Sequence, residues 1–335
     1  MPTIESTPEA PVSVLDLSKL KKGDRVQHAL MVQSRDERAT KDGMPFVTLS
    51  VGNRTGSLDV APIWQERLEW VEGVQPGKLV QVLGSITSYK EKRQLDLSGP
   101  LRILPMDGQS LNDFLPSITD DPIKLWDWID KERGAFKSKA LKAAVDLFFA
   151  DDDFRSHFQR TPGAPRGHHA LVGGLLLHVV EVARIGKGIA NVMNANAELV
   201  VAGALLHDIG KVEAYAIEPG GFTFTQSGYL LGHIVLGSLM LERRLPRLPP
   251  DALSESQALE LHHFIQSHHG IPEYGAAVPP MTVEAEILHW ADESSAKASS
   301  MAEVIASDEH FGGGAFSLRK PFPVDKRVWR RPHNW

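Results

Sequence analysis

The segment Leu205-Leu206-His207-Asp208-Ile209-Gly210-Lys211 ends an apolar run with a neighbouring histidine and aspartate and places a lysine one turn further on. An imidazole and a carboxylate at the end of a helix can both reach one cation, and Lys211 falls on the same side. By itself, a His-Asp pair is more often an ordinary surface or core feature. Its meaning therefore depends on the residues that the fold brings to it.

Four other segments each place side chains of a metal-binding type on an apolar helical face. These side chains are His178, His233, the neighbours His268 and His269, and Asp292. Any one alone is best explained as a core residue that is hydrogen-bonded to a backbone carbonyl. Burying the whole series unpaired would cost several kcal/mol for each group, whereas a shared cation satisfies all of them. The series predicts a metal site built from five separated segments.

Residues 123–311 have the periodicity of helices. Residues 123–150 form one helical stretch, and amphipathic segments follow one another from His169 onward, so we predict an all-helical domain. Residues 312–335 form a tail in which cations and aromatic rings follow three glycines. Contact with nucleic acid and packing as a strap on the helical domain are both open for this tail.

Residues 14–105 alternate instead with a period of two. About five short strands, separated by Gly, Asn and Asp turns, predict a small barrel. Residues 1–13 are expected to be a flexible N-terminus, and residues 106–122 a linker. The positions expected to face the barrel core are Val26, Leu30, Val32, Val47, Leu49, Val51, Leu58, Val60, Val80, Val82, Ile86, Leu95 and Leu97.

The composition of the 335 residues limits the chemistry further. The absence of cysteine excludes disulfides, thiolate-zinc sites and cysteine nucleophiles, so any metal must be held by nitrogen and oxygen. The net charge of −6 argues against an overall electrostatic grip on nucleic acid, although a local basic groove could capture phosphates. No secretory signal and no bilayer-spanning apolar run are present, so we expect a cytoplasmic protein without a membrane partner.

Four motifs together resemble those of a known family. They are His168-His169-Ala170-Leu171-Val172-Gly173-Gly174-Leu175, Leu206-His207-Asp208-Ile209-Gly210-Lys211-Val212, Gly232-His233-Ile234 and Ser267-His268-His269-Gly270. The series is similar to the HD superfamily of metal-dependent phosphohydrolases and, more closely, to YhaM-type 3′-to-5′ exoribonucleases. The resemblance covers nearly the whole chain. It implies a multidomain fold, with an N-terminal all-β OB-fold barrel followed by an all-α HD domain.

The resemblance also implies a ligand set and an activity. One metal would be held by His178, His207, Asp208 and Asp292, and a second by His233, His268 and His269, with Asp208 bridging. The implied reaction is hydrolysis of RNA from its 3′ end to nucleoside monophosphates. The sequence departs from the family at Leu177, where an acidic residue usually precedes the first metal histidine. The role of that acidic group is therefore in doubt.

Phosphodiester hydrolysis near neutral pH needs a generated nucleophile and neutralisation of charge on the phosphate. One or two divalent ions fit this need. The histidine-rich ligand set favours Mn²⁺, with Fe²⁺, Co²⁺, Zn²⁺ and Mg²⁺ as alternatives. Besides Asp208, the candidate catalytic residues are Lys211, to stabilise charge on the nonbridging oxygens, and His169 with His168, to orient the phosphate or protonate the leaving oxygen. A solvated Lys211 and simple capping by the two histidines are the competing interpretations.

The barrel is expected to bind single-stranded RNA, and binding of single-stranded DNA is left open. OB-type barrels bind oligonucleotides across strands two and three and the adjacent loops, by base stacking and phosphate pairing. The candidate contacts are Phe46, Lys41, Arg54, Tyr89, Lys90, Lys92 and Arg93. Packing or solubility would explain each of them as well. Trp64 is expected to cap the barrel core instead.

Two other functions stay open. An HD-type nucleotide or cyclic-dinucleotide phosphohydrolase is one, although Gly270-Ile271-Pro272 stands where the cyclic-dinucleotide type is expected to have Gly-Tyr-Pro. A barrel also makes more sense for a polymeric substrate. The second is a non-catalytic single-strand-binding protein with a structural metal site, against which the intact ligand series argues. Homo-oligomerisation is left open.

Overall fold

The computed structural model describes residues 15–89, 92–106, 114–167, 169–218, 221–322 and 324–334. The chain divides into two compact units, Met1–Leu115 and Pro116–Trp335. The division lies within residues 106–122, where the sequence predicts a linker. Each unit has a hydrophobic core of its own. Among the described helices, none is long and apolar enough to cross a bilayer.

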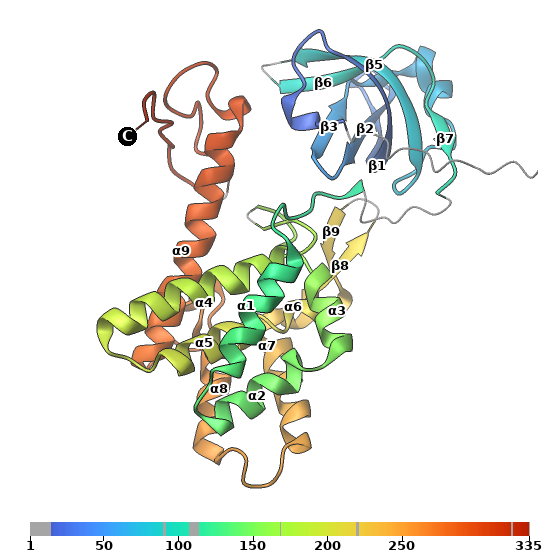
Figure 1. The fold of residues 1–335 in the computed structure, drawn as a ribbon. Coiled ribbons are helices and arrows are strands. Elements are labelled where there is room, and N and C mark those ends of the chain that lie inside the picture. Colours follow the sequence, from blue (N-terminus) through green and yellow to red (C-terminus); the bar gives the residue numbers. More distant parts are fainter. Residues whose placement is uncertain are drawn as a thin grey trace, which may run out of the picture. The chain divides into compact units, whose positions relative to one another are not determined.

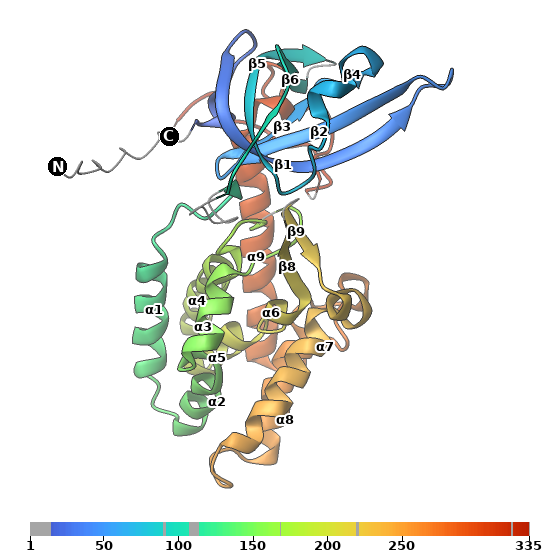
Figure 2. The ribbon, with the colours of Figure 1, turned by 90° about the vertical axis from the view of Figure 1, so that its right-hand side faces the viewer.

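The first unit is a closed β-barrel (Figure 1 and Figure 2). Strand β1 is antiparallel to both β2 and β5, and β3 runs parallel to β6, so the path β1-β2-β3-β6-β5 returns to its start. The predicted OB-type barrel is confirmed. Its strands are β1 (Arg25–Ala39), β2 (Pro45–Asn53), β3 (Gly56–Val60), β4 (Ile63–Trp64), β5 (Leu79–Tyr89), β6 (Lys92–Leu97) and β7 (Arg102–Leu104), with 3₁₀ turns at Leu17–Lys19 and Gln65–Val71.

The apolar positions that alternate along the strands form the barrel core. All those predicted from the sequence, from Val26 to Leu97, are at most 5% exposed, because successive side chains of a strand point to opposite faces. The alternation of burial is interrupted in β1. A register shift between Val32 and Ser34 of β1 accompanies the burial of Met31 directly beside Val32.

Arg93 has a structural role in the barrel that the sequence alone did not indicate. Its Nη1 donates hydrogen bonds to the carbonyl oxygens of Leu17, Ser18 and Leu20 at 3.3, 3.2 and 2.8 Å. The side chain thereby ties the segment before β1 to β6. Contact of Arg93 with nucleic acid stays a prediction, beside this structural role of its Nη1.

Replacing Arg93 by alanine is expected to lower the free energy of unfolding of the barrel by about 1–3 kcal/mol, because three carbonyls lose a charged donor. Urea unfolding followed by tryptophan fluorescence measures this change. Lys92→Ala is the matched control, since it removes an exposed cation from the neighbouring position and should leave stability unchanged. Equal stability of the two variants would contradict the structural role of Arg93.

The second unit is mainly α-helical (Figure 1). Its helices are α1 (Pro122–Gly134), α2 (Lys139–Phe149), α3 (Asp152–Arg160), α4 (Gly174–Met193), α5 (Ala197–Leu206), α6 (Lys211–Ala214), α7 (Gln226–Arg244), α8 (Glu255–Ser267) and α9 (Val283–Ala306). Most begin at a side chain that accepts a hydrogen bond from the first turn. These capping residues are Asp121, Ser138, Asp151, Asn196, Thr225, Ser254 and Thr282.

Helix α5 lies at the centre of this unit. Its residues from Val200 to Leu206 are all buried, as expected for a helix that is apolar on every side. It contacts α2, α4, α8 and α9. The helix therefore carries the His-Asp pair at its C-terminal end into the interior of the unit.

A two-stranded hairpin is an addition to the helical architecture that the sequence predicts. Strands β8 (Tyr215–Glu218) and β9 (Gly221–Phe224) are antiparallel and lie beside α6 and α7 in both views (Figure 1 and Figure 2). Four residues are too few to establish an alternating pattern, so periodicity did not reveal these strands. The predicted helical stretch 123–150 is also divided, at residues 135–138, into α1 and α2.

The C-terminal tail packs against the end of α9. Phe311 and Val328 are buried together with Val304 of α9, and the backbone amide of Val328 donates to Ser317 Oγ at 3.0 Å. These contacts support the interpretation of the tail as a strap. Some of its rings stay exposed, Phe322 most of all.

Candidate metal centre

The His-Asp pair lies at a tight exit from α5. His207 caps the helix, and Asp208 is 1% exposed. A Cβ on Gly210 would come within 2.0 Å of the carbonyl oxygen of His233 in α7, so only glycine allows this approach. The contact brings His233 close to Asp208 although the two residues are far apart in the sequence.

Asp208 faces two sets of imidazoles with its two oxygens. Its Oδ2 is 3.4 Å from His178 Nε2 and 3.2 Å from His207 Nε2. Its Oδ1 is 3.4 Å from His233 Nε2 and 3.7 Å from His268 Nε2. One carboxylate would thereby contribute an oxygen to each of the two sets of candidate metal ligands.

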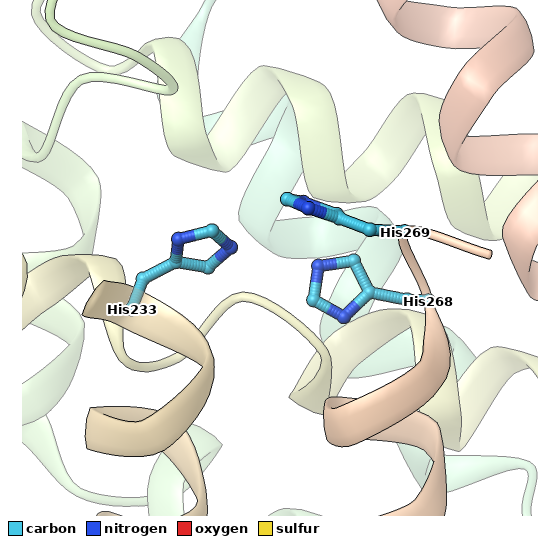
Figure 3. A group of neighbouring side chains, drawn as sticks. All are labelled: His233, His268 and His269. Carbon is cyan, nitrogen blue, oxygen red and sulfur yellow. The ribbon is translucent and has the colours of Figure 1, made fainter. Parts of the chain in front are cut away.

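The structure brings together every member of the predicted ligand series. His233, His268 and His269 form one group, in which Figure 3 shows His233 facing the pair from the opposite side. Two further groups, which share His207, also have their ligand atoms within 4.8 Å of one another. They are His178, His207 and Asp208, and His207, His268 and Asp292. Asp292 Oδ1 is in addition 3.0 Å from His178 Nε2.

Backbone carbonyls fix the orientation of three of the imidazole rings. Each ring has its Nδ1 within 2.5–2.9 Å of a carbonyl oxygen; the pairs are His207 with Ala204, His268 with Ile265, and His269 with Tyr274. A carbonyl can only accept, so Nδ1 carries the proton and Nε2 keeps its lone pair. These rings are therefore prepared to bind a cation through Nε2.

Several buried polar atoms in the centre make no hydrogen bond of good geometry to the part of the chain that the structure describes. They are Nε2 of His207, His233 and His268 and Oδ1 of Asp208. Such atoms would be costly to bury without partners. Divalent cations with nitrogen and oxygen ligands would satisfy them, so the residues present fit a metal centre.

The ionisation of the metal-free centre differs from one histidine to the next. Burial opposes a charge on His178, but hydrogen bonds to Asp208 and Asp292 raise its pKa to about 9. Burial lowers the pKa of His233 to about 3 and the pKa of His268 well below its ordinary value. Neighbouring cations hold the pKa of Asp208 well below its ordinary value despite its burial. At neutral pH the centre therefore combines anionic carboxylates with neutral His233 and His268 and a protonated His178.

Metal binding is expected to release about one proton at pH 7.5, because His178 must lose its proton before it can coordinate. With a pKa of about 9, His178 is almost fully protonated at pH 7.5 and half protonated at pH 9, so affinity rises with pH over this range. Titration calorimetry with Mn²⁺ in two buffers of different ionisation enthalpy measures the release at both pH values. Identical heats in the two buffers at pH 7.5 would contradict the prediction.

Lys211 belongs to the centre and is not a solvated residue. It is 8% exposed, and its Nζ lies 2.6 Å from Asp208 Oδ2. Burial disfavours the charge, but Asp208 raises the pKa of Lys211, so the amine is cationic at neutral pH. The interpretation of Lys211 as a solvated side chain near a helix end is therefore wrong.

His169 lies beside the centre on a tightly constrained loop. Its φ of 55° is in the left-handed region, and a Cβ on Gly174 would come within 2.0 Å of its carbonyl oxygen. Its ring centroid is 5.2 Å from that of His178. The side chain is buried beside the predicted ligand His178. His168 lies outside the described residues.

Glu181 and Ser295 are two residues of the site that the sequence reasoning missed. Glu181 Oε2 accepts from Ser295 Oγ at 2.7 Å and lies 3.1 Å from His169 Nε2, while Ser295 Oγ lies 3.2 Å from His178 Nδ1. Glu181 is one turn after His178, so helical spacing places it on the same side of α4, but this spacing alone does not identify its partners. An acidic group thus lies near His178 although Leu177 occupies the expected position.

The predicted nucleic-acid contacts of the barrel are mostly exposed. The exposed ones are Lys41, Arg54, Tyr89 and Lys92, and Lys90 lies outside the described residues. Phe46 is half-buried, and its ring centroid is 5.0 Å from that of Trp64. Trp64 is 45% exposed, so the expectation that it caps the core is wrong. Sequence reasoning therefore missed an exposed aromatic pair, because a tryptophan beside a strand pattern was assigned to the core.

Comparison with known proteins places this site in a family. Residues 175–297, from α4 into α9, match the family model of the HD domain. The 3′-5′ exoribonuclease YhaM of Listeria innocua is 31% identical over 317 residues, which cover 92% of this chain and 96% of that relative. The proteins of the same name from Bacillus subtilis and Oceanobacillus iheyensis are 29% and 28% identical, with 92% and 93% of this chain covered and 96% and 95% of theirs. Because this similarity extends through both units, the chain belongs to the YhaM family of HD-domain proteins.

Proposed function

We propose that the protein is a metal-dependent 3′-5′ exoribonuclease, which hydrolyses the phosphodiester bonds of RNA and releases nucleoside monophosphates. The observation that carries the proposal is Asp208, whose two buried oxygens face separate groups of imidazoles. Relatives named as exoribonucleases over nearly the whole chain support it, and an OB-type barrel adds a fold that binds oligonucleotides.

Divalent ions at this centre would supply a water nucleophile at neutral pH and neutralise charge on the phosphate. The side chains of the protein prepare that chemistry. Asp208 and Asp292 provide the negative charge that attracts the cations, with His178, His207, His233, His268 and His269 as the nitrogen ligands. Lys211, held cationic beside Asp208, is placed to stabilise charge that develops on a nonbridging oxygen. His169, which is held by Glu181, orients the phosphate or protonates the leaving oxygen.

We infer that Mn²⁺ is the preferred ion, because the ligand set is rich in imidazole and contains two carboxylates. Fe²⁺, Co²⁺ and Zn²⁺ suit the same donors, and Mg²⁺ suits them least. One or two ions per chain, turnover of single-stranded DNA and a cytoplasmic location stay predictions.

Digestion of end-labelled RNA and DNA with each of these metal ions tests the proposal. RNA labelled at its 5′ end should shorten progressively, whereas RNA labelled at its 3′ end should release labelled mononucleotide from the start. Cleavage of mononucleotides or cyclic dinucleotides in preference to RNA would favour a nucleotide phosphohydrolase. Binding of single strands without release of mononucleotides in any metal would favour a binding protein.

A further inference from the structure

Three aromatic side chains form a continuous row on the β8–β9 hairpin and the start of α7. The rings of Tyr215 and Phe224 lie opposite each other across the hairpin with centroids 5.2 Å apart, and the centroid of Phe224 is 4.9 Å from that of Tyr229. Exposure increases along this aromatic row. Tyr215 is half-buried, Phe224 is 36% exposed and Tyr229 is 71% exposed.

The inner end of the aromatic row lies close to the metal centre along the chain. Tyr215 follows Lys211 by four residues, and the short helix α6 between Asp208 and the hairpin contacts β8. Burial raises the pKa of Tyr215, and the charges of Lys211 and Asp208 act on it in opposite directions. The row therefore begins directly after the segment that carries Asp208 and Lys211.

Backbone contacts fix the aromatic row relative to the metal centre. The amide of Thr225 donates to the carbonyl of Ala214 at 2.9 Å, and Thr225 Oγ1 donates to the carbonyl of Glu213 at 2.7 Å. A Cβ on Gly228 would come within 2.1 Å of the Ala214 carbonyl oxygen. His233 follows a break in α7 at Gly232, whose φ of 73° and ψ of 161° are not helical. The contacts of Thr225 and Gly228 therefore hold the aromatic row against residues 213 and 214, directly after the segment that carries Asp208 and Lys211.

The innermost ring also borders open space. A cavity of about 250 Å³ is lined by Tyr215 and Ile217 of the hairpin, by Val212, and by residues of α3 and its C-terminal end that include His157, Arg160 and Thr161. Apolar side chains beside the cation Arg160 suit a nucleotide, which has a flat base and an anionic phosphate.

The outer ring is more exposed than a purely structural ring needs to be. Tyr229 leaves most of its surface uncovered, and its neighbours Leu230 and Leu231 are 75% and 46% exposed. Contiguous exposed apolar side chains beside an active centre are typical of a binding surface.

We propose that Tyr215, Phe224 and Tyr229 hold the unpaired bases at the 3′ end of the RNA by stacking, so that the terminal phosphodiester reaches the metal centre. This inference rests on the proposed exoribonuclease function and adds to it the subsite that receives the strand. Stacking on aromatic rings is independent of base identity, as a processive exonuclease requires. The aromatic row therefore recognises a single-stranded end and no particular sequence.

Binding of a hydrolysis-resistant RNA to the full-length protein with Mn²⁺ tests the aromatic row. The RNA carries phosphorothioate linkages at its 3′ end, and its last two nucleotides are either intact or abasic. For the wild type, loss of the two bases should weaken binding about tenfold or more, because each stacked base contributes to affinity. Tyr229→Ala should weaken binding of the intact RNA about tenfold and respond little to abasic ends. Tyr229→Trp should restore the affinity for the intact RNA and the loss of affinity that abasic ends cause.

Trp290→Ala is the matched control. Trp290 is 54% exposed on α9, and a separation of two residues places it on the side of the helix away from Asp292. Its loss should leave binding unchanged. The proposal would be overturned if Tyr229→Ala and Trp290→Ala bound the intact RNA with equal affinity. It would also be overturned if loss of the two terminal bases left binding by the wild type unchanged.

Photo-cross-linking locates the end of the strand independently of affinity. A 4-thiouridine at the 3′ terminus should cross-link to peptides that span residues 215–231, and cross-links only elsewhere in the helical unit would contradict the aromatic row. If the wild type digests RNA from its 3′ end but fails these tests, the proposed exonuclease function is retained and the role of the aromatic row is rejected. A wild type that digests nothing would overturn the exonuclease itself.

Discussion

Asp208→Asn is expected to reduce RNA digestion by at least about a thousandfold, because one carboxylate serves both groups of imidazoles. The substitution keeps the shape of the side chain but removes the charge that faces His178, His207, His233 and Lys211. Digestion of labelled RNA measures activity, and calorimetry with Mn²⁺ measures metal binding, which should weaken strongly. Binding of RNA by the barrel should persist, since Asp208 lies in the other unit.

The matched control for this substitution is Asp251→Asn, at an exposed position between α7 and α8. It removes the same charge and should leave digestion and metal binding unchanged. Circular dichroism confirms that both variants are folded. Undiminished digestion by folded Asp208→Asn would show that the assigned centre does not carry the reaction.

Removal of the metal is expected to lower the melting temperature of the helical unit by roughly 10 °C. Binding that is specific to the folded state adds about 4 kcal/mol when the ion is present at a thousandfold excess over its dissociation constant. For a unit of this size, each kcal/mol shifts the melting temperature by about 2–4 °C. The physical cause is that, without metal, Asp208 Oδ1 and the Nε2 atoms of His207, His233 and His268 stay buried without a hydrogen bond.

Scanning calorimetry with EDTA, and then with Mn²⁺ restored, measures this shift alongside recovery of digestion. The transition of the barrel serves as the internal control, because its core contains none of the ligands. Asp208→Asn should respond weakly to Mn²⁺. Superimposable melting curves of the wild type in EDTA and Mn²⁺ would contradict a metal centre in the interior of the helical unit.

The sequence predicts those parts of the molecule that depend on long periodic segments. The predicted core positions of the strands were correct because alternation over five or more residues leaves one face of a strand apolar. The inward-facing positions of His178 and Asp292 could be predicted because a long helix determines the side on which each of its residues lies. The hairpin β8–β9 was missed because its strands have four residues each. Glu181 was missed for another reason. A polar residue one turn from a ligand looks the same in sequence whether it meets Ser295 or water.

The structural role of Arg93 was missed because the charge of a residue in a sequence does not identify the groups that it contacts. The local sequence around an arginine is the same whether its guanidinium donates to three backbone carbonyls, as in Arg93, or binds a phosphate. Trp64 failed similarly, since only the pairing of β4 with β2 places its ring beside Phe46 at the surface. Contacts between distant segments decided both outcomes.

The close approach of Gly210 to the carbonyl of His233 bears on how relatives could come to use other ions. The separation between the Asp208 turn and α7 is set by backbone touching backbone, so exchanging a ligand side chain leaves that separation as it is. Accommodating an ion of different radius would instead require a shift of the whole helix. Selectivity should therefore change through residues that seat the part of α7 after its break at Gly232, such as Gly237, whose backbone amide also lies against Gly210.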